Sequence, residues 1–194
     1  SDNPNDYIAG FPSPPHRGFE TVPYILAGKV RHEDNAGHGG IIESGGIQWM
    51  TAGRGIIHSE MPEQEHGRLA GFQLWVNLPA AYKMCPPAYH EYSANQIPTD
   101  IRDNGVTLRV ITGTTSTQTI GPVQGVATDP IYLDITLPSG STLTEPIPEG
   151  HTAFIFVIDG RLNLPDNENT QVSLNTKQLG TLSDGTAICV TAGD

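Results

Sequence analysis

Short runs in which apolar and polar residues alternate make up most of the hydrophobic pattern of this chain. They occur at 72–78, 106–112, 131–137, 153–158 and 187–191. Side chains on a β-strand point to opposite faces in turn, so a period of two is typical of a strand with one buried face. No segment has the spacing of a long amphipathic helix. The pattern therefore predicts an all-β protein.

The composition agrees with many short strands joined by turns. Glycine and proline account for 22 and 16 of the 194 residues, and both favour turns over long helices. One helical turn is expected around 79–84. Apolar residues make up only 37% of the chain, but they are gathered in blocks that can fill a core. We therefore expect a folded protein rather than a disordered one.

Two pairs of segments indicate an internal repeat. Residues 18–28 and 150–160 each run from a glycine through nine mostly strand-forming residues to a second glycine and a basic residue. Further along each half, 44–53 resembles 183–193. Duplication of an antiparallel unit explains this order, and chance similarity of glycine-bounded strands is the alternative.

The charge balance excludes some classes of partner. Ten Lys and Arg against 21 Asp and Glu give a net charge of −11. Such a chain repels phosphate backbones and anionic membranes, so we expect no direct binding of nucleic acid. No apolar run approaches the ~20 residues that a membrane span needs, and no membrane association is expected. An acidic surface is compatible with a basic protein partner, such as a DNA-binding domain of a transcription factor.

The cysteines and the first residues bear on the compartment. The chain has two cysteines, Cys85 and Cys189, and a small secreted domain held together by disulfides normally has more. The polar, acidic segment 1–6 is not a signal peptide. We expect a cytoplasmic protein, or a nuclear one if the cell is eukaryotic. Because the chain lacks an initiator Met, it is expected to be a processed or truncated product.

Histidines are concentrated in the first half of the chain, and some of them have the spacing of metal ligands. His58 and Glu60 stand two residues apart, so on a strand they share a face. His16 and Glu20 share a face in the same way. Together, His16, His58 and Glu60 would supply two imidazoles and one carboxylate. That set suits Fe(II) and leaves coordination positions open for substrate and dioxygen. A capping or surface pair is the alternative interpretation of His58 and Glu60.

Three strings of sequence resemble one protein family. They are HRGFETV at 16–22, QWMTAGRGIIHSEMP at 48–62 and QLWVNL at 73–78, and they are similar to motifs of the pirin family in the cupin superfamily. The resemblance implies a bicupin, with two β-barrel (jelly-roll) cupin domains in tandem, placed here at 1–98 and 99–194. Pirins normally extend further at both ends, so strands are expected to be missing at each terminus.

The resemblance also implies a metal site. The family holds one metal with three histidines and one glutamate, and the matching positions are His16, His58, Glu60 and a fourth position two before His16. Pro14 occupies that fourth position and has no side-chain donor. Fe(II) is the expected metal, with Ni, Cu, Mn, Co or Zn as alternatives, and an empty site is a further alternative. Glu20 is expected to orient His16, although an ordinary strand-end carboxylate is equally compatible.

Other conspicuous residues are assigned structural roles. His32 and His38 are expected in loops or at strand ends, outside the ligand set, and Trp49 and Trp75 are expected in the core. Pro23 falls where the family continues a β-strand, so we expect it at an edge or a bulge. The second domain is expected to lack a metal site.

Two functions are compatible with the resemblance. The first is a flavonol dioxygenase of the quercetin 2,3-dioxygenase type, in which Glu60 acts as ligand and shares in deprotonating the substrate. Its substrates would be a flavonol and dioxygen, and the ring would open with release of carbon monoxide. The second is a metal-binding transcriptional co-regulator or protein-interaction module that has no turnover. In either case the protein is expected to be a monomer.

Overall fold

The computed structural model describes residues 1–10, 15–35, 37–165 and 171–193. Within these ranges the regular structure consists of antiparallel β-sheets and three short 3₁₀ turns, so the predicted all-β class is confirmed. The turns are η1 (Pro4–Asp6), η2 (Ala80–Tyr82) and η3 (Ala94–Gln96). The second of them lies at the predicted helical turn. Among the described residues, no helix is long and apolar enough to cross a membrane.

Contacts divide the chain into two compact units. The first contains Ser1–Pro98, Ile111–Gly113 and Gly121–Ile131, and the second contains Thr99–Val110, Thr114–Ile120 and the chain from Tyr132 onward. These units are defined by contacts alone, so the predicted cupin limits of 1–98 and 99–194 stay a prediction.

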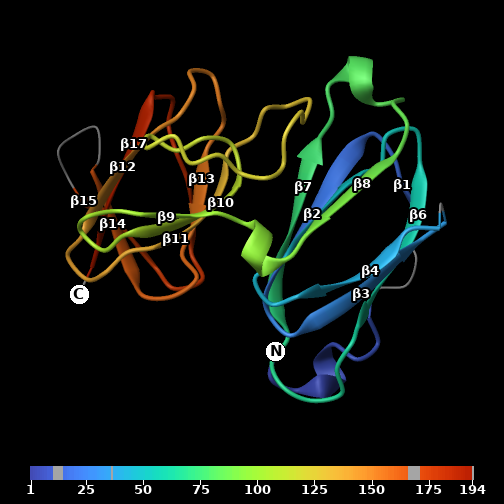
Figure 1. Cartoon of the computed structure of the whole chain (residues 1–194). Helices are drawn as coiled ribbons and strands as arrows, with labels where there is room; N and C mark the ends of the chain where they lie inside the picture. Colours follow the sequence, from blue (N-terminus) through green and yellow to red (C-terminus); the bar gives the residue numbers. More distant parts are fainter. Residues whose placement is uncertain (11–14, 36, 166–170, 194) are drawn as a thin grey trace. The chain divides into compact units, whose positions relative to one another are not determined.

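The first unit is built from two four-stranded sheets (Figure 1). One sheet has the order β1 (Pro15–His16), β6 (Ile56–Pro62), β3 (Lys29–Asp34) and β4 (Gly39–Glu43). The other has the order β7 (Ala70–Asn77), β2 (Phe19–Ala27), β5 (Ile47–Thr51) and β8 (Ala88–Tyr92). The alternating run at 72–78 thus forms β7, as its period predicts.

The second unit repeats part of this plan. Its four-stranded sheet has the order β12 (Thr142–Pro146), β17 (Ala187–Ala192), β14 (Arg161–Pro165) and β15 (Gln171–Asn175). Two smaller sheets pair β13 (Phe154–Phe156) with β16 (Leu179–Thr181), and join β11 (Tyr132–Thr136), β10 (Thr107–Thr112) and β9 (Thr99–Ile101). The other four predicted strand segments correspond to β10, β11, β13 and β17.

The strand orders test the internal repeat. The order β1-β6-β3-β4 in the first unit has the same connectivity as β12-β17-β14-β15 in the second, and the pair β2/β5 has its counterpart in β13/β16. Residues 18–28 and 150–160 therefore hold equivalent strands, β2 and β13. The second match is wrong, because 44–53 contains β5 whereas 183–193 contains β17, the counterpart of β6. The similar glycine spacing matches β5 with β17, although the counterpart of β17 is β6, the next strand along the chain.

Pro23 does not lie at an edge or a bulge, contrary to the expectation. It belongs to β2, which has β7 on one side and β5 on the other. On the β5 side, pairs form at Glu20, Thr21 and Tyr24 in one constant register, and Val22 and Pro23 have no pair. On the β7 side the ladder continues through Pro23 opposite Gln73. The missing N–H is thus accommodated by a gap in one ladder, without an extra residue.

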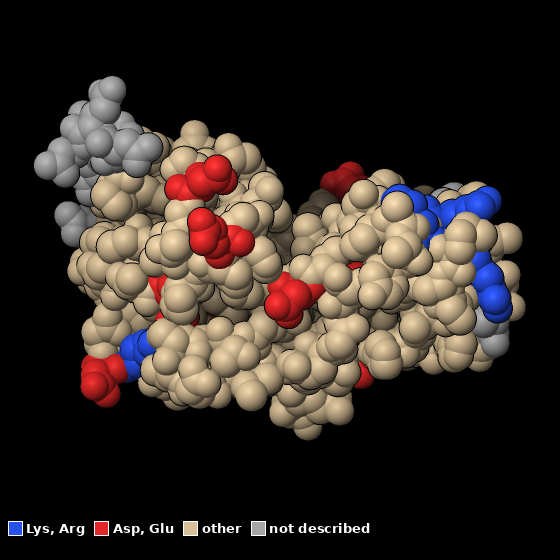
Figure 2. Space-filling model, turned by 90° about the horizontal axis from the view of Figure 1, so that it is seen from above, with Lys and Arg blue, Asp and Glu red and all other residues tan. Residues whose placement is uncertain are grey.

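The interiors of the two units differ in chemistry. The second unit has an apolar cluster, formed by Val106, Leu108, Leu143, Val157, Leu162 and Val190. The first unit buries apolar residues such as Val22, Ile47 and Met50, and it also buries polar side chains. At the surface, Figure 2 shows one face on which acidic side chains are scattered, most basic side chains gather in one group, and a smaller basic patch lies apart beside an acidic side chain.

Candidate metal centre

Strand β6 presents three buried residues on its inner face. Ile56, His58 and Glu60 are buried, and the residues between them are exposed or half-buried. This is the alternation expected of a strand with one covered face. The sequence pattern therefore correctly places His58 and Glu60 on one face.

Strand β3 adds a second histidine to this face. The antiparallel pairing sets His32 opposite Glu60 and Asp34 opposite His58. Side chains directly opposite each other in such a pair lie on the same face of the sheet. The His32 side chain is 0% exposed in the interior of β3, so the expectation of a loop or strand-end histidine is wrong. The motif RHED has no periodicity that would have revealed this.

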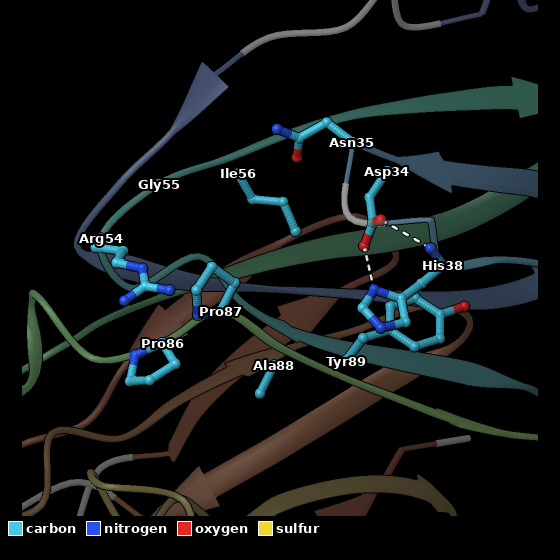
Figure 3. A pocket seen from close by; sticks show the side chains of 10 residues that line it. All are labelled: Asp34, Asn35, His38, Arg54, Gly55, Ile56, Pro86, Pro87, Ala88 and Tyr89. Carbon is cyan, nitrogen blue, oxygen red and sulfur yellow. Dashed lines mark hydrogen bonds and ion pairs between the residues drawn. The ribbon is translucent and has the colours of Figure 1, made fainter.

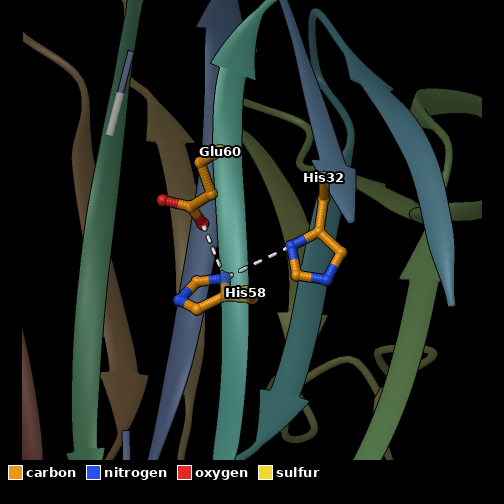
Figure 4. Close-up of side chains that lie close together, drawn as sticks. All are labelled: His32, His58 and Glu60. Atoms are coloured by element: carbon orange, nitrogen blue, oxygen red, sulfur yellow. Dashed lines mark hydrogen bonds and ion pairs between the residues drawn. The ribbon is translucent and has the colours of Figure 1, made fainter. Parts of the chain in front are cut away.

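The three side chains form a compact donor group (Figure 4). His58 Nδ1 lies 3.3 Å from His32 Nδ1 and 4.0 Å from Glu60 Oε1. One potential ligand atom from each residue lies within 4.8 Å of the other two, and in the described part of the chain no other such group of His, Cys, Asp or Glu occurs. Two atoms that each bond one ion at about 2.1 Å can be at most about 4.2 Å apart, so only a small adjustment would let one ion reach all three.

His16 lies beside this group. Strand β1 places it opposite Ile56, on the same face of the sheet. Its ring is buried, with its centroid 4.8 Å from that of His58. That His16, His58 and Glu60 ligate one ion stays a prediction, and the donor group found here takes His32 as its second imidazole.

Burial sets the protonation of these histidines. It lowers the pKa of His16 and His32, and it lowers the pKa of His58 to about 4 with further contributions from His32 and His16 as potential like charges. His58 is therefore neutral at neutral pH. A neutral imidazole has a free lone pair, which is the form that binds a metal.

Glu60 is held by a residue of the opposite sheet. Gln73 of β7 donates from Nε2 to Glu60 Oε2 at 3.1 Å and to Oε1 at 3.3 Å. Burial raises the pKa of Glu60, and the hydrogen bond from Gln73 partly offsets this. A carboxylate that is costly to bury and has one amide partner is suited to a cation. Nothing in the sequence around Gln73 marks it for this role.

Unpaired buried atoms fit the same interpretation. The Nε2 atoms of His32 and His58 are buried and have no hydrogen-bond partner among the described residues. Buried polar atoms normally have partners, so such atoms indicate a missing ligand or water. Two imidazoles and a carboxylate are the donors that first-row divalent metals accept, and these residues therefore fit a metal ion.

The structure does not test the roles predicted for Glu20 and Pro14. Glu20 is buried and accepts a hydrogen bond from Thr51 Oγ1 at 2.7 Å. It is adjacent to Phe19, whose ring packs edge-on against His16, and neighbours along a strand point to opposite faces. Its orienting role toward His16 stays a prediction. Pro14 lies outside the described residues.

A pocket of about 340 Å³ is lined in part by Tyr89, which also contacts the donor group (Figure 3). The ring of Tyr89 stacks on buried His32 and on exposed His38, with centroids 5.2 and 5.8 Å apart. His38 Nδ1 lies within hydrogen-bonding distance of Asp34 Oδ2, at 2.9 Å, and His38 is not a member of the donor group. Tyr89 is thus shared between the donor group and the pocket.

Sequence comparisons identify close relatives. A family model described as Pirin matches residues 1–76. A pirin-like protein of Caulobacter vibrioides is 52% identical over 164 residues, which are 84% of this chain and 59% of that protein. A Thermoplasma acidophilum protein, named provisionally as a quercetin 2,3-dioxygenase, is 38% identical over 213 residues, covering 98% of this chain and 78% of the relative. The chain thus spans about three fifths of the first relative and more of the second.

Solved structures show the same fold. A crystal structure of quercetin 2,3-dioxygenase from Acinetobacter baumannii superposes with a TM-score of 0.85 at 36% identity, covering 94% of this chain and 64% of that one. This match confirms the predicted two-domain cupin architecture. The motif at 48–62 also contains β6, which carries His58 and Glu60. Since the identity to the Thermoplasma relative extends over nearly the whole chain, the chain belongs to the pirin family of the cupin superfamily.

Proposed function

We propose that this protein is a metal-dependent dioxygenase that opens the ring of flavonols, of the quercetin 2,3-dioxygenase type. The observation that carries the proposal is the buried group of His32, His58 and Glu60, in a chain whose relatives include proteins named for that activity. Its substrates would be a flavonol and dioxygen.

The residues that would hold the metal are His32, His58 and Glu60, with His16 as a fourth donor beside His58. In this arrangement His32 supplies the third imidazole, which Pro14 cannot. Fe(II) is the metal proposed, because two imidazoles and one carboxylate with open positions are the donors of non-haem Fe(II) oxygenases. A bound divalent ion would act as a Lewis acid toward the 3-hydroxyl oxygen of the flavonol.

The side chains of the chain itself have two tasks. Glu60, with a pKa raised by burial, would accept the proton of the 3-hydroxyl group on one carboxylate oxygen. Gln73 holds that carboxylate in place through its amide. With its pKa lowered to about 4, His58 is a weak proton acceptor and would serve as a neutral metal donor rather than as the base.

The test combines metal analysis with an oxygen-dependent assay. The purified chain is loaded with Fe(II), and loss of the quercetin absorbance band and release of carbon monoxide are followed in air. Glu60→Gln should reduce turnover by about 100-fold or more, which is the usual contribution of a general base. His66→Gln, at an exposed histidine outside the donor group, should leave turnover unchanged. No turnover by the metal-loaded chain would contradict the proposal.

A metal-binding regulator is the second candidate. The net charge of −11 favours docking to a basic partner over binding to nucleic acid. Tight metal binding together with no loss of flavonol would favour this function over the dioxygenase.

A further inference from the structure

Trp75 is exposed next to the donor group, so the expectation that it lies in the core is wrong. Its side chain is 61% exposed. It stands two residues from Gln73 on β7, so both side chains lie on the same face of the strand. Since Gln73 reaches the carboxylate of Glu60, that face of β7 is directed toward the donor group.

A continuous series of rings joins Trp75 to the histidines. The indole packs on Phe19 with centroids 4.9 Å apart and on His16 with centroids 5.6 Å apart. The His16 ring in turn lies 4.8 Å from that of His58. Two neighbours therefore hold the indole in place, and most of its surface still faces solvent. A large apolar surface kept open beside polar donors is typical of a ligand site.

We infer that Trp75 is the platform on which the planar ring system of the substrate stacks. The inference rests on the proposed function and adds the residue that selects flat aromatic molecules. Aromatic rings prefer offset-stacked or edge-on contact at about 4.5–7 Å, and such a contact contributes beyond the area it buries. Because Phe19 and His16 already fix the indole, little side-chain entropy is lost when a ligand binds.

The test measures binding without turnover. The Fe(II)-loaded chain is titrated in the absence of oxygen with quercetin, and separately with its 2,3-dihydro analogue. The analogue keeps the hydroxyl groups, but its saturated ring is not planar. Trp75→Ala should bind quercetin about tenfold more weakly, which corresponds to ~1.4 kcal/mol, and should bind the analogue nearly as the unaltered chain does. Trp75→Phe keeps a flat ring and should lose less than Trp75→Ala.

Tyr82→Ala is the matched control. It also removes an exposed aromatic ring, 51% exposed on η2 and outside the ring contacts of Trp75. Quercetin affinity should be unchanged in this variant, and circular dichroism should show that all variants are folded.

The outcomes separate this inference from the proposed function. If Trp75→Ala binds quercetin as tightly as the unaltered chain, the platform is refuted, whatever the turnover in air. An equal loss of affinity for both compounds would also overturn it, because the effect would then not depend on planarity. If quercetin binds through Trp75 and is not consumed in air with metal present, the inference stands and the dioxygenase proposal fails.

Discussion

The two units use one strand order for two kinds of interior. In the first unit the sheet β1-β6-β3-β4 carries the donor group, and in the second the sheet β12-β17-β14-β15 carries an apolar cluster. The registers align them. Val30 of β3 and Leu162 of β14 each stand two residues after the glycine that ends the preceding repeat segment. Val30 lies opposite Pro62 of β6, and Leu162 lies opposite Ala192 of β17.

This alignment identifies the counterparts of the donors. His32, His58 and Glu60 correspond to Leu164, Ile188 and Val190. All three of the latter belong to or pack against the apolar cluster. Burying apolar side chains stabilises a fold directly, whereas burying donors costs free energy that hydrogen bonds such as the one from Gln73 offset in part and a bound ligand can recover further. The comparison indicates that the first unit gives up stability for binding.

The largest effect is expected from a charged residue placed in the apolar interior of the second unit. Val190→Glu places a carboxyl group at a position that is 3% exposed, without the amide partner that Gln73 gives Glu60. We expect the free energy of unfolding to fall by roughly 3 kcal/mol, measured by urea denaturation. Val172→Glu, at a 48% exposed position in the same sheet, should change it by less than about 0.5 kcal/mol. Equal effects of the two substitutions would show that position 190 does not lie in an apolar interior.

A smaller effect is expected when the first unit is made to resemble the second. His58→Ile removes the donor at the centre of the group and should weaken metal binding by about 100-fold, ~2.7 kcal/mol, in competition with a chelator of known affinity. Without metal, the free energy of unfolding should be unchanged or higher, because a poorly partnered buried imidazole is gone. His66→Ile is the control at an exposed histidine. Undiminished metal affinity in His58→Ile would place the metal elsewhere.

The smallest effect is a pH dependence of the metal-free chain. Burial lowers the pKa of His58 to about 4, below its value in the unfolded chain. The unfolded state therefore takes up a proton first, and the stability from this group, present above about pH 6.5, is lost as the pH falls toward 4. Glu60, whose pKa is raised by burial, acts in the opposite sense and partly offsets this loss.

Melting temperatures measured between pH 7 and pH 5 test this slope. The unaltered chain should lose stability over this range, and His58→Ile should lose less. A slope that is the same in both would mean that His58 is not protonated more readily on unfolding.

Local sequence determined the strands, the family and two of the three residues of the donor group. A period of two predicts β7 and β11 because strand side chains alternate between faces, and the same rule puts His58 and Glu60 together from their spacing alone. The glycine-bounded segments that hold β2 and β13 could be matched for the same reason, since each contains one strand and its turn.

Only the tertiary structure decided which side chains complete the site. His32 is 26 residues from His58, and it joins the group because the register of β3 on β6 sets it opposite Glu60. A shift of one residue would turn it to the other face, and no local pattern records such a register. Gln73 and Trp75 reach the site from the opposite sheet. Their alternation predicts a strand but not which face is left open, because exposure depends on what the rest of the fold places in front of it.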